Sequence, residues 1–127
     1  MPIDHISIYP TPEKFEDTVA WYLKALNPLK YTEILRFPGA VGLGTNGKPD
    51  FWVIAKENAA KQDNHFAFRA DDKETVNRFH AAGVEAGGKC NGPPGPRPQY
   101  APEYYGAFVF DPIGNNVEAV GFFPVEK

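Results

Sequence analysis

The sequence predicts an α+β fold in which one unit, a strand followed by a helix and three further strands, occurs twice. Two observations favour it. A histidine opens a predicted strand in each half of the chain, at His5 and at His65, and the same order of predicted elements follows each one. The apolar and polar residues after the two histidines also alternate in the same phase. Because duplicated units tend to lie around a twofold axis, two histidines far apart in the sequence can converge in space.

The first half supplies one complete unit. Residues 3–9 alternate like a half-buried strand, with His5 on the face opposite Ile6 and Ile8. Thr11 suits a helix N-cap and Pro12 suits the first helical position, and apolar residues then recur at helical spacing until residues 27–28 end the helix. Three further strands are predicted between turns rich in glycine and proline, at residues 31–37, 40–44 and 51–55.

The second half repeats this order. A strand at 65–70 precedes a predicted capping box, Asp71 to Glu74, and a helix that Gly83 is expected to end. Two later strands are predicted at residues 106–110 and 117–122. Before these strands, residues 83–98 contain four prolines and several glycines, so most of this stretch is predicted to be a long loop. Such a loop either covers a binding site or is a disordered excursion.

Length and charge narrow the classes of function. We expect one compact domain over residues 1–127, with the first repeat at about 1–57 and the second at about 63–127. A net charge of −3 gives no footprint for nucleic acid or an anionic membrane, which leaves a small molecule as the expected partner. No signal peptide or long apolar run is present, so the cytoplasm is the expected location.

Two imidazoles and one carboxylate on strands can form a divalent-metal site with open positions. His5, His65 and the strand residue Glu118 are the candidates, although a strand histidine taken alone is more often a hydrogen-bonded structural residue. His80 falls on the second predicted helix, where a surface role is expected. Cys90 has no histidine or nucleophile motif near it in the sequence, so no catalytic thiol is expected.

The terminal motif resembles a known family. Residues 104–119 contain an aromatic pair, a strand, an Asp-Pro-Ile-Gly-Asn turn and Glu118, and Asp4-His5-Ile6-Ser7 and His65-Phe66-Ala67-Phe68 support the match. The chain thus resembles the vicinal oxygen chelate superfamily of glyoxalase I, bleomycin- and fosfomycin-resistance proteins, methylmalonyl-CoA epimerase and extradiol dioxygenases. The resemblance implies a cupped mixed sheet around a cavity, a homodimer, and His5, His65 and Glu118 as ligands of an Fe, Mn, Zn or Ni ion.

The resemblance departs from glyoxalase I at the fourth ligand. Aligning the turn at Gly47 with the turn at Gly114 sets Phe51 on Glu118, and a slip of one residue would set Asp50 or Trp52 there instead. Glyoxalase I activity is therefore not expected. The resemblance still implies lyase, isomerase or dioxygenase chemistry on a small molecule with neighbouring oxygens. The alternative is a protein of the bleomycin-resistance type that sequesters a small molecule without altering it.

Other polar and aromatic residues complete the candidate site. Tyr104 and Tyr105 are candidate proton donors beside Glu118, although an aromatic cluster at this position also suits a small core. Arg69 shares the face of His65, where it can pair with a substrate anion or make a structural salt bridge. The residues expected to contact substrate are Ser7, Tyr9, Trp52, Arg69, Arg97 and Tyr100.

Overall fold

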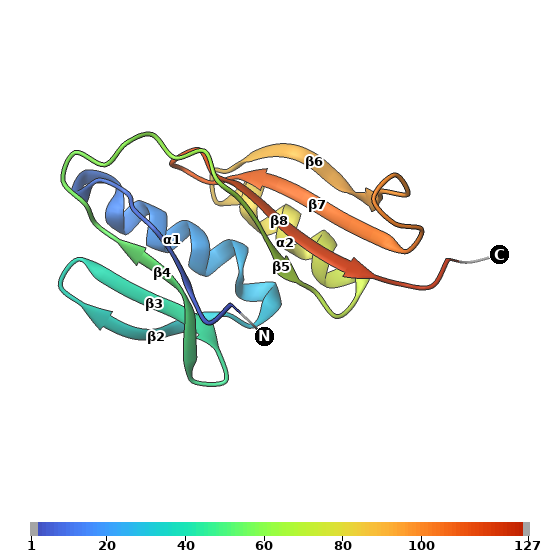
Figure 1. Cartoon of the computed structure of the whole chain (residues 1–127), viewed down its shortest axis with the longest axis horizontal. Coiled ribbons are helices and arrows are strands. Elements are labelled where there is room, and N and C mark those ends of the chain that lie inside the picture. The colour runs from blue at the N-terminus through green and yellow to red at the C-terminus, as the bar shows by residue number, and fades with distance from the viewer. Residues whose placement is uncertain (1–2, 126–127) are drawn as a thin grey trace.

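The computed structural model describes residues 3–125 and consists of two four-stranded sheets with a helix in each half (Figure 1). The strand order is β1-β4-β3-β2 in the first sheet and β5-β8-β7-β6 in the second. In each sheet the first strand pairs in parallel with the last, and the other pairs are antiparallel. The predicted α+β fold and its order of elements are confirmed.

The elements of the first half are β1 (Ile6–Ile8), the 3-10 turn η1 (Pro12–Lys14), α1 (Phe15–Ala25), the 3-10 turn η2 (Asn27–Leu29), β2 (Thr32–Phe37), β3 (Ala40–Thr45) and β4 (Lys48–Ile54). Those of the second half are β5 (His65–Arg69), α2 (Lys73–Glu85), β6 (Lys89–Pro96), β7 (Tyr104–Phe110) and β8 (Asn116–Phe122).

Both predicted ends of α2 differ from the observed ones. The N-cap is Asp72 and not Asp71, because the Asp72 carboxylate accepts a hydrogen bond from the Thr75 amide at 2.7 Å. The helix also continues through Gly83 to Glu85. Gly83 serves close packing, since its carbonyl accepts a hydrogen bond from the indole Nε1 of Trp21 at 2.9 Å and a Cβ there would lie 3.3 Å from that ring. A glycine in a helix pattern therefore marked a contact between α1 and α2.

The N-cap provides a test of this boundary. Replacing Asp72 with alanine is expected to lower the urea midpoint of unfolding, whereas Asp71→Ala leaves it nearly unchanged. The hydrogen bond from Thr75 lowers the pKa of Asp72, so its contribution is present above the pKa of an unfolded aspartate. It disappears as the pH falls through the lowered folded value. Denaturation of both variants at neutral and strongly acidic pH checks this, and an equal loss in the two variants would contradict it.

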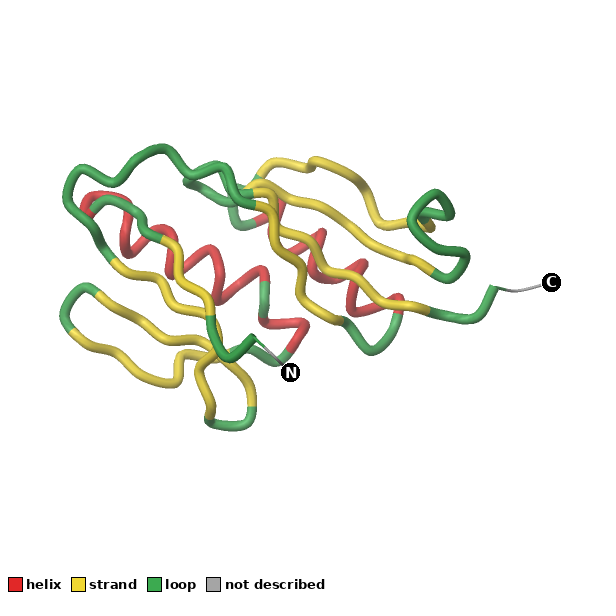
Figure 2. Tube along the Cα trace, viewed as in Figure 1, coloured by secondary structure: helices red, strands yellow, loops and turns green. Residues whose placement is uncertain are grey.

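The proline-rich stretch forms a strand, which corrects the predicted loop. Residues 89–96 are β6, paired with β7 at the edge of the second sheet, and only residues 97–103 connect the two strands (Figure 2). Proline lacks an N–H donor and is therefore tolerated where one side of a strand has no partner. The pairing also shifts register between Cys90 and Gly92 and again between Gly92 and Gly95. These irregularities accommodate the prolines.

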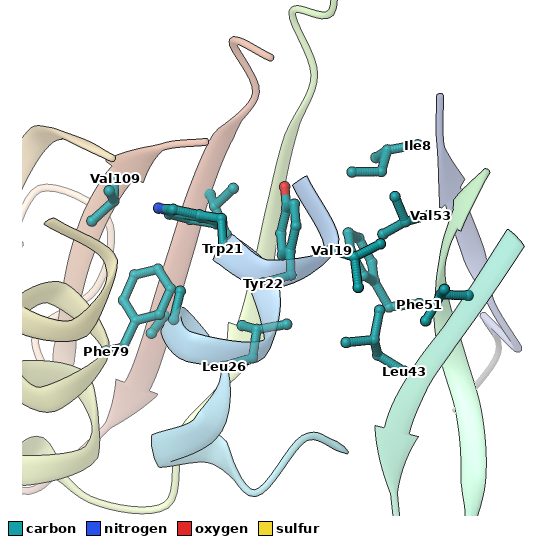
Figure 3. Packing of buried hydrophobic residues seen from close by; sticks show 14 of the residues in the cluster. Ile8, Val19, Trp21, Tyr22, Leu26, Leu43, Phe51, Val53, Phe79 and Val109 are labelled. Atoms are coloured by element: carbon teal, nitrogen blue, oxygen red, sulfur yellow. The ribbon is translucent and has the colours of Figure 1, made fainter. Parts of the chain in front are cut away.

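The core lies on the helix side of both sheets. In Figure 3, Val19 and Tyr22 of α1 point toward Phe51 in the first sheet, and Trp21 points toward Phe79 of α2. The rings of Tyr22 and Phe51 have centroids 4.7 Å apart. Since strand residues alternate, the neighbours of these buried residues emerge on the other side of each sheet. We call the side of each sheet that faces away from α1 and α2 its open face.

The register of the parallel pairs identifies the counterpart of Glu118. Ser7 pairs with Trp52, and the corresponding Ala67 pairs with Glu118. Trp52 and not Phe51 therefore occupies the position of the fourth ligand in glyoxalase I. The predicted alignment was wrong by one residue because the β3–β4 hairpin has a register shift, which leaves Asp50 as an extra residue in β4. Trp52 lies on the open face of the first sheet.

Candidate functional site

Glu118 lies at the centre of the open face of the second sheet, yet it is only 2% exposed. Its Oε1 is 3.1 Å from Nε2 of His65, and its Oε2 accepts a hydrogen bond from the Tyr104 hydroxyl. Gly106 leaves room for this arrangement, because a Cβ there would lie 3.0 Å from Oε2 of Glu118. Three neighbouring strands, β5, β8 and β7, thus each contribute one polar side chain to a single cluster.

The orientation of His65 requires a proton or a cation between its ring and Glu118. Its Nδ1 is 2.9 Å from the carbonyl oxygen of Asn116. A carbonyl only accepts, so Nδ1 carries the proton and Nε2 of the neutral ring presents a lone pair. That lone pair faces a carboxylate oxygen. Two acceptors at 3.1 Å require a proton or a cation between them, and a histidine held at its other nitrogen by a carbonyl is the usual form of a metal ligand.

Tyr104 keeps its proton under ordinary conditions. Burial, followed by the hydrogen bond to Glu118 and the charge of that carboxylate, raises the pKa of the Tyr104 hydroxyl above its usual value. The charge of Arg97 acts in the opposite direction. The protonated hydroxyl donates to one oxygen of Glu118, which holds the carboxylate in place and leaves the other oxygen facing His65.

Asn116 is a site residue that the sequence reasoning missed. It lies two residues before Glu118 on β8, so both side chains emerge on the open face. Its Oδ1 is buried and is the one such side-chain atom without a hydrogen-bond partner in residues 3–125. The alternation of β8 was the available signal, because it sets Asn116 and Glu118 in one row.

His5 does not join this cluster within one chain. Its Nδ1 is 2.8 Å from the Asp4 carboxylate, and both side chains are exposed. Across residues 3–125, no three side chains of histidine, cysteine, aspartate or glutamate lie close enough to hold one ion. The structure therefore brings His65 and Glu118 together and does not meet the expectation that His5 converges on them in the same chain.

Tyr105 lies on the wrong side of the sheet to act beside Glu118. Its hydroxyl donates to Oδ1 of Asn77 on α2 at 2.7 Å, and the Lys73 ammonium is 5.4 Å from its ring centroid. Adjacent strand residues point to opposite faces, so Tyr104 on the open face commits Tyr105 to the helix side. The expectation of Tyr105 as a proton donor is corrected accordingly.

The other predicted contacts divide between the two sheets. On the second sheet, the guanidinium of Arg69 lies 4.9 Å from the ring centroid of Phe122 and that of Arg97 lies 5.4 Å from that of Phe108. Tyr100 packs against Tyr104, with ring centroids 5.1 Å apart. Ser7 and Trp52 are paired residues of the first sheet, and Tyr9, just after β1, is 39% exposed with the Lys56 ammonium over its ring.

A groove of about 840 Å³ runs between the two halves. Asp4, Tyr31 and Asp50 line it from the first half, and His65 and Arg69 line it from the second. The Tyr31 hydroxyl donates to the Asp50 carboxylate at 2.8 Å, and burial together with that contact raises the pKa of Tyr31 above its usual value. The groove reaches His65 but not Glu118 or Tyr104, so it is continuous with only one edge of the cluster.

A histidine and a cysteine form a second contact, which lies away from this cluster. Nε2 of His80 is 3.1 Å from Sγ of Cys90, although no histidine lies near that cysteine in the sequence. The two residues are ten apart in sequence, on α2 and β6, and only the packing of helix on strand brings them together. Burial lowers the pKa of His80. Cys90 pairs with the core residue Val109, whose side chain points away from the open face.

In residues 3–125, no helix is long and apolar enough to cross a membrane.

Comparisons with known proteins agree with this fold. A crystal structure of a glyoxalase/bleomycin resistance protein from Albidiferax ferrireducens is 23% identical, with a TM-score of 0.81, and the match covers 95% of this chain and 99% of that one. Lactoylglutathione lyase from Agrobacterium tumefaciens is 19% identical, with a TM-score of 0.68 and coverage of 94% and 92%. The fosfomycin resistance protein FosX from Mesorhizobium loti is 17% identical, with a TM-score of 0.66 and coverage of 94% and 90%.

Among curated protein sequences none matches significantly. Residues 3–119 match the family model of the glyoxalase, bleomycin resistance protein and dioxygenase superfamily. This match extends from before β1 into β8 and includes His5, His65 and Glu118. The chain therefore belongs to the glyoxalase/bleomycin resistance protein/dioxygenase superfamily.

Proposed function

We propose that the protein binds a divalent metal ion at His65 and Glu118 and acts on a small molecule with neighbouring oxygen atoms, in lyase, isomerase or dioxygenase chemistry. The observation that carries this proposal is the 3.1 Å approach of Nε2 of His65 to the Glu118 carboxylate, with the other imidazole nitrogen held by a carbonyl. A nitrogen and oxygen donor set suits Fe, Mn, Zn or Ni. When bound, such an ion supplies Lewis acidity toward the substrate oxygens.

We further propose that a second copy of the chain supplies His5 as the third ligand in a homodimer. The open face of the first sheet exposes two large apolar side chains, Leu35 at 44% and Phe37 at 55%, and Phe37 stacks on Trp52. Apolar surface of this kind is commonly covered by a partner. Stacking this face on the open face of the second sheet of another copy would enclose the ion between His5 of one chain and His65 and Glu118 of the other.

The residues around the ion then have distinct roles. Trp52, at the position of a fourth ligand, supplies an apolar wall in place of a carboxylate, which leaves coordination positions open for substrate oxygens. For the same reason we do not propose a glyoxalase I reaction. Tyr104 holds Glu118 and is the proton donor nearest to it. The substrate would also contact residues farther from the ion, at the edge of the enclosed site: Ser7, Tyr9 and Tyr100.

Metal content tests the proposal directly. Protein prepared without an affinity tag or chelator is expected to bind one ion per site, and His65→Gln should abolish that binding because it removes the ring nitrogen that faces Glu118. His80→Gln is the matched control, because His80 contacts Cys90 instead. Elemental analysis and calorimetric titration with Zn²⁺ and Mn²⁺ provide the measurement. Undiminished metal binding by His65→Gln would contradict the proposal.

Tyr104→Phe is expected to weaken metal binding by roughly 10–100-fold, the usual effect of removing a side chain that orients a ligand. The variant removes only the hydroxyl that donates to Glu118. Tyr105→Phe is the control, since it removes a hydroxyl on the opposite face of the same strand. Metal titration of the two variants makes the comparison, and an equal effect in both would mean that Tyr104 acts only through strand stability.

The aromatic residues on the open faces favour a second candidate, a protein that sequesters a planar small molecule without altering it. Trp52 stacks on Phe37, and Phe122 is 44% exposed beside Arg69. This candidate predicts that such a ligand quenches tryptophan fluorescence equally well with and without metal. Dependence of binding on the metal favours the enzyme.

A further inference from the structure

We infer that the ligand of this site carries an oxyanion, such as a carboxylate or a phosphonate, in addition to its chelating oxygens, and that Arg97 binds it. This inference rests on the proposed metal site. It concerns the end of the ligand that points away from the ion, toward the edge strand β6.

The guanidinium of Arg97 lies at one end of the cross-strand row of residues that contains Glu118. Across the open face of the second sheet, Glu118 pairs with Phe108, and Phe108 pairs with Gly92 on β6. Gly92 has no side chain, and the guanidinium of Arg97 fills that space, since a Cβ on Gly92 would lie 3.1 Å from its Nη2. With adjacent strands about 4.8 Å apart, Gly92 is roughly 10 Å from Glu118 across the sheet. A ligand the size of one substituted ring spans that interval.

The guanidinium is held in place before any ligand binds. Its Nη2 donates to the carbonyl of Pro93 at 2.7 Å, and its Nη1 donates to those of Gly95 at 3.0 Å and Pro96 at 3.4 Å. It also stacks on Phe108, whose ring centroid is 5.9 Å from that of His65. Arginine has five N–H donors, so two remain without an acceptor in the described part of the chain. A fixed guanidinium with free donors is suited to an oxyanion.

The charge of Arg97 is also unbalanced. No carboxylate within residues 3–125 forms an ion pair with it, whereas Arg36 on the first sheet pairs with both Glu16 and Glu33. Arg69, on the opposite edge strand β5, likewise has no carboxylate partner among these residues. Two uncompensated guanidinium groups therefore flank Glu118 in a protein whose net charge is −3. This local excess of positive charge favours an anionic ligand over a neutral one.

A pair of chelators that differ only in one carboxylate tests the inference. Catechol and 3,4-dihydroxybenzoate present the same two neighbouring oxygens, and only the second carries the anion. Zn²⁺-loaded wild-type protein is expected to bind 3,4-dihydroxybenzoate about tenfold or more tightly than catechol, the usual worth of a charged hydrogen bond. Arg97→Gln should remove this preference and leave catechol binding unchanged, while Arg36→Gln should preserve it. Calorimetry at neutral pH measures both ligands.

Three results would overturn the inference, and they are distinguishable. Equal affinity of wild-type protein for both ligands would exclude the anion site while leaving the chelating site intact. Equal weakening of both ligands by Arg97→Gln would mean that Arg97 only braces β6. Failure of catechol itself to bind the Zn²⁺-loaded protein would refute the proposed chelating site, and the inference with it.

Discussion

Glu118→Gln is expected to lower the affinity for a divalent ion by more than the roughly 10–100-fold that loss of an outer-shell partner costs. The substitution removes the negative charge from the centre of the open face of the second sheet and replaces one carboxylate oxygen with an amide NH2 group. That amide can donate to the lone pair on Nε2 of His65, so the variant should fold at least as stably as the wild type. Loss of metal without loss of fold is therefore the expected signature.

Calorimetric titration with Zn²⁺, read beside a urea denaturation curve, separates these two effects. Glu74→Gln, on α2, is the control and should bind metal as the wild type does. Retention of the metal by Glu118→Gln would remove the carboxylate from the ligand set. Unfolding of the variant would contradict the expectation that the fold does not require the Glu118 charge.

Asp111→Ala is expected to cost about 3 kcal/mol or more of unfolding free energy, because each buried donor left without a partner costs about 1–3 kcal/mol. Asp111 is 6% exposed and accepts hydrogen bonds from the Ile113 amide, from the amide and side chain of Asn115, and from the hydroxyl of Tyr22. Tyr22 is fully buried, and burial followed by the charge of Asp111 raises its pKa. Its hydroxyl would lose its partner.

Two milder variants complete the series. Tyr22→Phe removes one hydrogen bond to Asp111 and should cost about 1–3 kcal/mol. Asp111→Asn keeps an acceptor for the Ile113 and Asn115 amides. It should therefore lower the unfolding free energy by less than Asp111→Ala does. Urea denaturation measures all three, and a loss of less than about 1 kcal/mol for Asp111→Ala would contradict this account of the turn.

The sequence was most informative where structure is local. The turn from Asp111 to Asn115 was predicted from its residue types, and the hydrogen bonds to Asp111 with Gly114 at φ +99° agree with it. That turn sets the register of β8 and therefore the face on which Glu118 emerges. The parity of β5 set His65 on the same face in the same way. These two short patterns indicated the face of each residue, whereas the expectation that His65 and Glu118 share one site came from the resemblance to the family.

The errors arose where distant contacts decide the structure. The prolines of β6 are tolerated because that strand lies at a sheet edge, which no local pattern in residues 89–96 reveals. The β3–β4 hairpin contains the extra residue Asp50, which shifts the register by one. Trp52 and not Phe51 therefore lies at the fourth ligand position. His5 was expected beside His65 because the repeats correspond, but equivalence of two units leaves open whether they meet within one chain or between two.

Metal binding by mixed dimers tests most directly whether His5 of one chain meets His65 and Glu118 of another. Chains carrying His5→Gln and chains carrying Glu118→Gln are to be co-expressed with two different tags that bind no metal, and the heterodimer isolated. If each site takes His5 from one chain and His65 with Glu118 from the other, both parent variants lack the ion and the heterodimer regains one ion per dimer. A heterodimer as empty as its parents, or full metal binding by His5→Gln alone, would contradict a site shared between two copies.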